Sequence, residues 1–120
     1  MAVKTGGTRP GSTYKVTTDT GLTNTMVVDV SGGSGTFYGL ECTSGSGAIV
    51  LRLYDDTSAV AGTTVPLIAY LIPASTTFSV NIPEGIPFTN GLSYNATQTD
   101  ADAATTTAPS HTSTLFIYTS

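Results

Sequence analysis

The sequence has little of what most active sites are built from. It contains one cysteine, one histidine and no tryptophan, and only 10% of its 120 residues are charged. A single cysteine excludes an intramolecular disulfide and a metal site built from several thiolates. Ordinary globular domains carry about 25% charged residues. This chain must therefore cover its surface with other polar groups, and roughly a third of its residues are serine or threonine.

Long apolar runs and strong helix formers are also scarce. The longest apolar stretch, residues 65–72, is far shorter than the ~20 residues of a membrane-spanning helix. The residues after Met1 lack the apolar segment of a secretory signal, so we expect synthesis in a cytosol and no membrane partner. Threonine is β-branched and favours strands. Composition and length together predict one all-β domain.

Charge is unevenly distributed. Lys4, Arg9 and Lys15 are the only charged residues among the first fifteen, whereas the rest of the chain carries one arginine and all eight acidic residues. Nucleic acid requires a broad basic surface, so an acidic body with a small basic segment does not suit it. We predict that residues 1–12 form an extended arm, which is either a floppy terminus or a tether that lies on another protein.

Apolar and polar residues alternate along much of the chain, as in half-buried strands. About eight such segments are separated by turn residues at the spacing of a β-sandwich or barrel. We predict a single-domain antiparallel β-sandwich over residues 13–120, either jelly-roll or immunoglobulin-like. Arg52 is predicted to face solvent. The residues predicted to share a face are Met26, Val28 and Val30; Tyr38, Leu40 and Cys42; Ile49, Leu51 and Leu53; Phe78, Val80 and Ile82; and Leu92, Tyr94 and Ala96.

Two segments, VPLIAYLI at residues 65–72 and TLFIYT at residues 114–119, are apolar on both faces. Such a strand is either covered by a loop or part of an interface with another chain. A domain of this size has little chain left to cover two strands, which favours an interface between subunits. The candidate contact residues are Leu67, Ile68, Tyr70, Phe116 and Tyr118, together with Lys4 and Arg9 of the arm.

The segment NIPEGIPFTNGLSYNAT is rich in turn residues. Pro83 keeps Ile82 extended, and with Gly85 it fits a type I turn, so a strand is predicted to end at Ile82. Asn90-Gly91 supplies a second turn. Asn95 begins a glycosylation triplet, but without a secretory signal we expect no glycosylation. The segment is interpreted as turns and not as a ligand site.

No catalytic, metal or cofactor site is predicted. The pairs Asp55-Asp56 and Asp100/Asp102 have the oxygen ligands of Ca²⁺, but a hard cation needs more of them at closer spacing, so both pairs are interpreted as turn residues. His111 lies in a hydroxyl-rich segment and is interpreted as a solvated side chain. Cys42 is predicted to be a buried thiol and not a nucleophile.

Residues 51–102 resemble small virion proteins of tailed bacteriophages. The resemblance is carried by turn motifs at the ends of successive strands, and the N-terminal third of the chain takes no part in it. The motifs are Leu53-Tyr54-Asp55, Gly62-Thr63 with Pro66, Pro73-Ala74, Gly85 with Phe88, and Gly91-Leu92-Ser93.

The resemblance implies a β-sandwich structural protein without catalytic residues. Proteins of this kind often decorate or cement the capsid exterior. We therefore expect a homo-oligomer, a trimer or a dimer, that binds the major capsid protein and stabilises the shell of the virion. The alternative is a component of the tail or of another appendage, including an adhesin for the host surface. An enzyme is not favoured.

Overall fold

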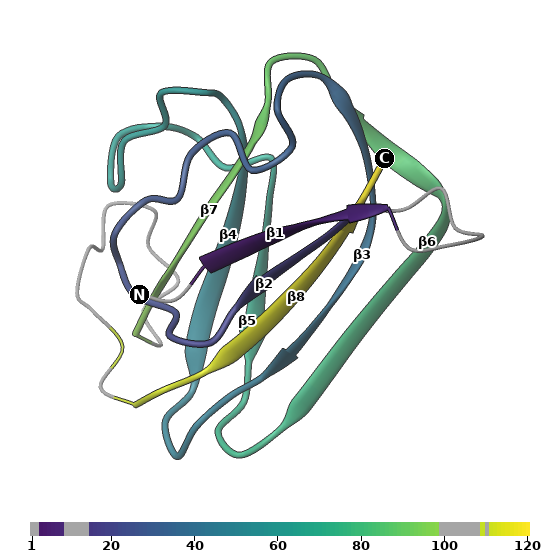
Figure 1. The fold of residues 1–120 in the computed structure, drawn as a ribbon. Coiled ribbons are helices and arrows are strands. Elements are labelled where there is room, and N and C mark those ends of the chain that lie inside the picture. The colour runs from purple at the N-terminus through teal and green to yellow at the C-terminus, as the bar shows by residue number, and fades with distance from the viewer. Residues whose placement is uncertain (1–2, 9–14, 99–108, 110) are drawn as a thin grey trace.

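The computed structural model describes residues 3–8, 15–98, 109 and 111–120 (Figure 1). All regular elements in these ranges are β-strands, arranged as two antiparallel sheets packed face to face. This confirms the predicted antiparallel β-sandwich. The described ranges contain no helix that is long and apolar enough to cross a membrane.

The two sheets differ in size. In the larger sheet the spatial order is β1 (Val3–Thr8), β2 (Lys15–Asp19), β8 (Thr114–Thr119), β3 (Gly35–Thr43) and β6 (Thr77–Phe88). In the smaller sheet it is β5 (Ile68–Ile72), β4 (Ile49–Asp55) and β7 (Leu92–Thr97).

An irregular segment, residues 23–30, runs along the free edge of β7. The Val27 and Tyr94 backbones bond reciprocally, and Val30 N–H donates to the carbonyl of Leu92 at 2.8 Å. The order of a jelly roll can be compared if β2 is counted as element 1, residues 23–30 as element 2, and β3 to β8 as elements 3 to 8. In this numbering the larger sheet without β1 has the order 1-8-3-6, and the smaller sheet with the added segment has the order 2-7-4-5. This is the order of a jelly roll, in which two Greek keys are wrapped into a sandwich. The topology is therefore not immunoglobulin-like.

The core lies between the sheets and consists of the faces that alternation predicts for β4, β6 and β7. Tyr70 of β5 and Phe78 of β6 close one side, with ring centroids 5.4 Å apart. The buried core residues of the central strands are Leu40, Cys42, Ile49, Leu51, Leu53, Leu92, Tyr94, Ala96, Leu115 and Ile117, and Phe78, Val80 and Ile82 pack against them.

The prediction that Arg52 faces solvent is wrong. Arg52 does point away from the core, as alternation requires, but it is only 1% exposed. Its Nη1 donates to Thr97 Oγ1 at 2.6 Å, and beside it the Tyr54 hydroxyl donates to Asn95 Oδ1 at 3.1 Å. Asn95 Nδ2 in turn donates to the carbonyl of Asn24. Polar side chains satisfy one another there, and β4 and β7 are buried on both faces, whereas β5 stays partly exposed.

The strand predicted at residues 24–30, with Met26, Val28 and Val30 on one face, is also wrong. The stretch makes one bridge to β7 and no ladder. Asp29 has a positive φ of 50°, which breaks an extended strand. Val27 and Val30 both pack against the core, whereas Val28 is 48% exposed.

Tyr38 does not share a face with Leu40 and Cys42. Strand β3 has a bulge between Phe37 and Gly39, where its register shifts against both neighbours. A bulge adds a residue and reverses the alternation beyond it. Phe37 therefore takes the core position and is fully buried, whereas Tyr38 points outward.

The predicted end of a strand at Ile82 is wrong as well, because β6 continues to Phe88. The pairing with β3 shows that residues 82–85 lie opposite Tyr38 alone. Pro83 has no N–H to donate, and Gly85 has a φ of 75° that most side chains disfavour. These turn residues therefore bend the strand outward as a long bulge instead of ending it.

The predicted arm, residues 1–12, is described only at residues 3–8. These form β1, which pairs antiparallel with β2 at the edge of the larger sheet, with Lys4 opposite Thr18. Residues 1–2 and 9–12, including Arg9, lie outside the described residues. A role of the arm in attachment stays a prediction.

Candidate functional site

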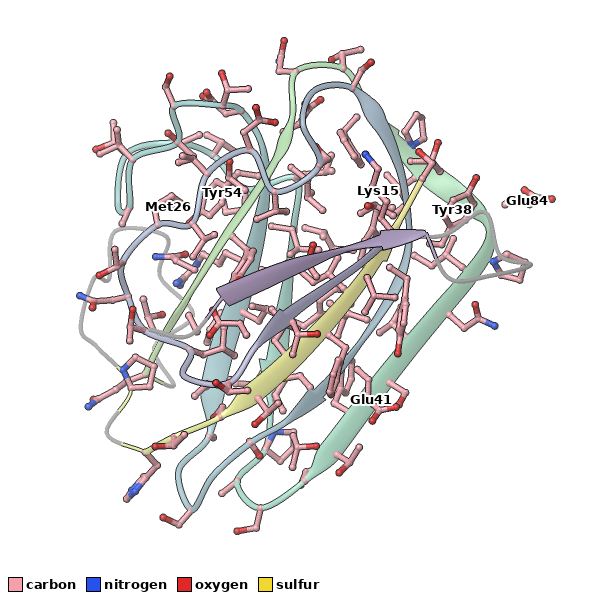
Figure 2. All side chains as sticks on the ribbon, viewed as in Figure 1. Lys15, Met26, Tyr38, Glu41, Tyr54 and Glu84 are labelled. Atoms are coloured by element: carbon pink, nitrogen blue, oxygen red, sulfur yellow. The ribbon has the colours of Figure 1, made fainter. Side chains whose placement is uncertain are left out.

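A groove of about 410 Å³ lies on the outer face of the larger sheet, over β8, β3 and β6. Leu40 and Val80 direct their side chains toward the core, so they contribute main chain to its floor. The residues whose side chains surround it are Tyr38, Glu41, Ser79, Asn81 and Tyr118, with Gly39 between them. Tyr38 and Glu41 both lie on the side of the molecule formed by β3 and β6 (Figure 2).

The floor of the groove contains a glycine in the middle of the sheet. Gly39 pairs with Tyr118 on one side and with Asn81 on the other. Its φ is 152°, and a Cβ at this position would collide with the carbonyl oxygen of Val80. Gly39 therefore contributes only main chain to the floor, between the side chains of the neighbouring strands.

The long bulge of β6 builds the other end of the groove. A Cβ on Gly85 would lie 3.0 Å from Cε1 of Tyr38, so the tyrosine ring rests directly over this glycine. The ring is thereby held at the end of the groove, on the same face as Glu41 and Tyr118. Sequence reasoning missed the groove, although the glycine inside the apolar strand TFYGLECT was a visible sign of a bulge.

No protein-family model matches this chain, and neither does any curated protein or solved structure.

The predicted contact residues of β5 divide into two groups. Ile68 and Tyr70 point inward and pack against the core, and burial raises the pKa of the Tyr70 phenol. Leu67 is 40% exposed, and Leu71 and Val65, which were not among the predicted contacts, are 61% and 84% exposed. We call Val65, Leu67 and Leu71 the apolar edge, because β5 is the last strand of the smaller sheet.

The predicted contact residues Phe116 and Tyr118 lie on the outer face of β8. Both are partly exposed, whereas Leu115 and Ile117, which alternate with them, belong to the core. Tyr118 lines the groove and Phe116 does not. The structure thus places these residues on the larger sheet and the apolar edge on the smaller one, and the two sets do not form one surface.

The Asp55 carboxylate binds the turn between β6 and β7, where the chain passes from the larger sheet to the smaller one. Its oxygens accept hydrogen bonds from the backbone N–H groups of Thr89, Asn90 and Gly91 at 3.0, 2.8 and 3.4 Å, and from the Thr89 hydroxyl at 3.1 Å. Burial raises the pKa of Asp55, but these hydrogen bonds outweigh it, so the pKa lies below its ordinary value. A carboxylate occupied in this way fixes the chain, in agreement with its predicted role in a turn.

No metal site is found among the residues that the structure describes, since none of their His, Cys, Asp and Glu side chains form a group of three or more suited to a metal ion. Asp56 accepts a hydrogen bond from the backbone of Ser58 at 2.7 Å, which is a local turn. The predicted pair Asp100 and Asp102 lies outside the described residues.

The structure also describes the environments of His111 and Cys42. His111 Nδ1 lies 2.9 Å from Ser46 Oγ, and both side chains are at the surface. Cys42 is fully buried in the core, as predicted, and burial raises the pKa of its thiol to about 12. A thiol with this pKa is protonated at neutral pH and is a poor nucleophile.

One buried polar contact, between Asp19 and Tyr94, was not predicted from the sequence. Asp19 and Tyr94 are both fully buried, and the Tyr94 hydroxyl donates to Asp19 Oδ2 at 2.7 Å. Asp19 Oδ1 accepts a hydrogen bond from Gly21 N–H at 2.9 Å. Burial raises the pKa of Tyr94, and the hydrogen bond and charge of Asp19 raise it further. The contact joins β2 to β7 across the sandwich.

Proposed function

We propose that this chain is a structural virion protein, a capsid decoration protein that attaches to the outer surface of the capsid as an oligomer. The resemblance of residues 51–102 to small phage virion proteins supports the proposal. The observation that carries it is the apolar edge, where three large apolar side chains are exposed within residues 65–71, because exposed apolar patches are typical of protein interfaces.

Among the large apolar side chains that the structure describes, those of the apolar edge include the two most exposed, ahead of Val60 at 56% and Val28 at 48%. Val65 is 84% and Leu71 is 61% exposed. Strand β5 pairs with β4 on one side and, within the described ranges, has no strand on the other. Its outer edge therefore offers unpaired backbone groups beside apolar side chains, a combination that another chain can cover by adding a strand.

The jelly-roll topology agrees with this role by analogy. Jelly rolls occur in viral capsid proteins, and they occur also in lectins and cupins. Because one fold serves many functions, the topology supports the proposal only together with the apolar edge. The groove on the larger sheet supports the alternative, an appendage protein that recognises a host surface, since such a protein needs a ligand site.

The proposal is tested with the double variant V65S/L71S. Wild-type protein is expected to form an oligomer in sedimentation analysis and to remain bound to virus particles that lack it. The double variant is expected to lose both properties, because each serine removes an apolar contact from the interface. The control is V28S: Val28 is 48% exposed and lies in the segment along β7, at the opposite edge of the smaller sheet.

Each outcome has a clear meaning. If the double variant assembles and binds like the wild type, the apolar edge is not the contact surface. If the wild type neither self-associates nor binds particles, the chain is not a decoration protein. Electron microscopy of labelled protein then distinguishes the two virion roles, since a decoration protein is spread over the shell and an appendage protein is confined to the tail or fibres.

A further inference from the structure

We propose that the groove on the larger sheet binds a neutral saccharide, with the ring of one sugar lying between Tyr38 and Tyr118. This site goes beyond the proposed structural role and does not depend on it. The groove belongs to the larger sheet and the apolar edge to the smaller one, so a molecule attached through the edge keeps the groove available.

The size and position of the groove suit a small ligand. Its volume of about 410 Å³ is near the lower end of the range for small-molecule sites, about 300–1,000 Å³. Extended peptides that bind a sheet usually add a strand alongside its edge, whereas this groove lies on the outer face of β8, β3 and β6. A compact ligand therefore fits better than a chain.

The lining combines two kinds of group that sugars require. Tyr38 and Tyr118 offer aromatic surface on which the C–H face of a sugar ring can pack. Glu41, Asn81 and Ser79 add a carboxylate, an amide and a hydroxyl. Together these groups accept and donate hydrogen bonds, which matches the alternating hydroxyls of a sugar.

Charge restricts the class of sugar. The lining contains Glu41 but no lysine or arginine, and the whole chain has a net charge of −4. A phosphate, sulfate or carboxylate in the groove would lie close to the Glu41 carboxylate without a cation to offset the repulsion. Nucleotides and acidic sugars are therefore disfavoured, and neutral hexoses or their N-acetyl derivatives are expected.

The backbone geometry makes the groove preformed. The two bulges that shape it are fixed by Gly39 and Gly85, whose φ values of 152° and 75° favour glycine. The Tyr38 ring rests on Gly85. Binding therefore needs little reordering of the main chain, which lowers the entropic cost of association.

The experiment is an NMR titration of the ¹⁵N-labelled full chain with the methyl glycosides of glucose, galactose, N-acetylglucosamine and glucuronic acid. At least one neutral glycoside is expected to bind with a millimolar or lower Kd. Its chemical-shift changes should centre on the residues that line the groove. Methyl glucuronide has the ring of methyl glucoside with one added carboxylate, so it is the matched probe for the effect of charge.

Two variants and one control assign the contacts. Y118A is expected to weaken binding of the neutral glycoside about tenfold, as expected for the loss of one aromatic contact. F116A is the matched control, because Phe116 lies on the same face of β8 but outside the groove, and it should leave the Kd unchanged. E41Q should reduce the difference between the Kd values of methyl glucoside and methyl glucuronide, since it removes the charge that repels the glucuronide carboxylate.

Several results would overturn the proposal. It fails if none of the neutral glycosides shifts the groove resonances, or if the shifts lie elsewhere in the protein. It also fails if F116A weakens binding as much as Y118A while both variants give folded spectra. Stronger binding of the glucuronide than of the glucoside would refute the assignment of a neutral ligand. Because every measurement uses the isolated chain, these outcomes are separate from those of the particle-binding assay.

Discussion

The hydrogen bond between Tyr94 and Asp19 provides the sharpest test of how the sandwich is held together. Both residues are fully buried, and the Tyr94 hydroxyl lies 2.7 Å from Asp19 Oδ2. The variant Y94F keeps the ring and its packing and removes only the hydroxyl. A hydrogen bond to a charged group contributes about 1.5–3 kcal/mol, so we expect Y94F to lower the free energy of unfolding by about 2 kcal/mol.

Urea unfolding measures this loss. With a typical denaturant dependence of about 2 kcal/mol per molar urea for a small domain, the midpoint should fall by about 1 M with an unchanged slope. The matched control is Y54F, which removes the neutral hydrogen bond from Tyr54 to Asn95 and should cost about 1 kcal/mol. If Y94F unfolds at the midpoint of the wild type, or costs less than Y54F, the buried carboxylate does not depend on this bond.

The same pair predicts a pH dependence. Burial, and then the hydrogen bond and charge of Asp19, raise the pKa of Tyr94, whereas an unfolded tyrosine titrates near pH 10. The stability due to this shift is complete below about pH 10 and is lost as the pH rises further, because only the unfolded chain releases the proton. Above pH 10 the free energy of unfolding should therefore fall less steeply with pH for Y94F than for the wild type. The two slopes should differ by up to about 1.4 kcal/mol per pH unit. Equal slopes would contradict the burial of the phenol.

Three further predictions concern other buried or anchoring groups. R52S should cost more than about 1 kcal/mol in urea unfolding, because it leaves the buried Thr97 hydroxyl without its donor at 2.6 Å, and a cost near zero would mean that water replaces the guanidinium. Cys42, with a pKa of about 12 and no exposed surface, should not react with a thiol reagent at pH 8 until the protein unfolds. The pKa of Asp55 is lowered in the folded protein. Its contribution to the free energy of unfolding is therefore present above the unfolded pKa of about 3.9 and is lost as the pH falls through the folded pKa. D55N should for this reason lose less stability on acidification than the wild type, as measured by urea unfolding at several pH values.

The alternation of residue types predicted the sandwich and most of its core. It placed Leu51 and Leu53 of β4 inward, and the structure does the same. It could not show that Arg52 is buried, because alternation reports which residues share a face and not whether that face is covered. The covering contacts, such as Thr97 beside Arg52, join strands that are far apart in the sequence.

The bulges were the second limit of the sequence reading. Alternation assumes a regular register, and one added residue reverses it. Gly39 and residues 82–85 include the glycine and proline that are typical of turns. The same residue types occur in bulges, so the sequence could not distinguish a turn from a bulge. The groove depends on both bulges, so the candidate site became visible only with the pairing of β3 and β6.

The interruption of β6 also bears on the proposed association between copies of this protein. β6 is one free edge of the larger sheet, and Pro83 and Pro87 lie within it, so it cannot present a continuous row of N–H donors to another strand. β5 is short and contains no proline. Two β5 strands that meet antiparallel would form a two-fold contact that uses the same residues from both copies. A contact of that kind is complete at two subunits, so pairing through this edge ends in a closed pair and does not propagate into a fibre.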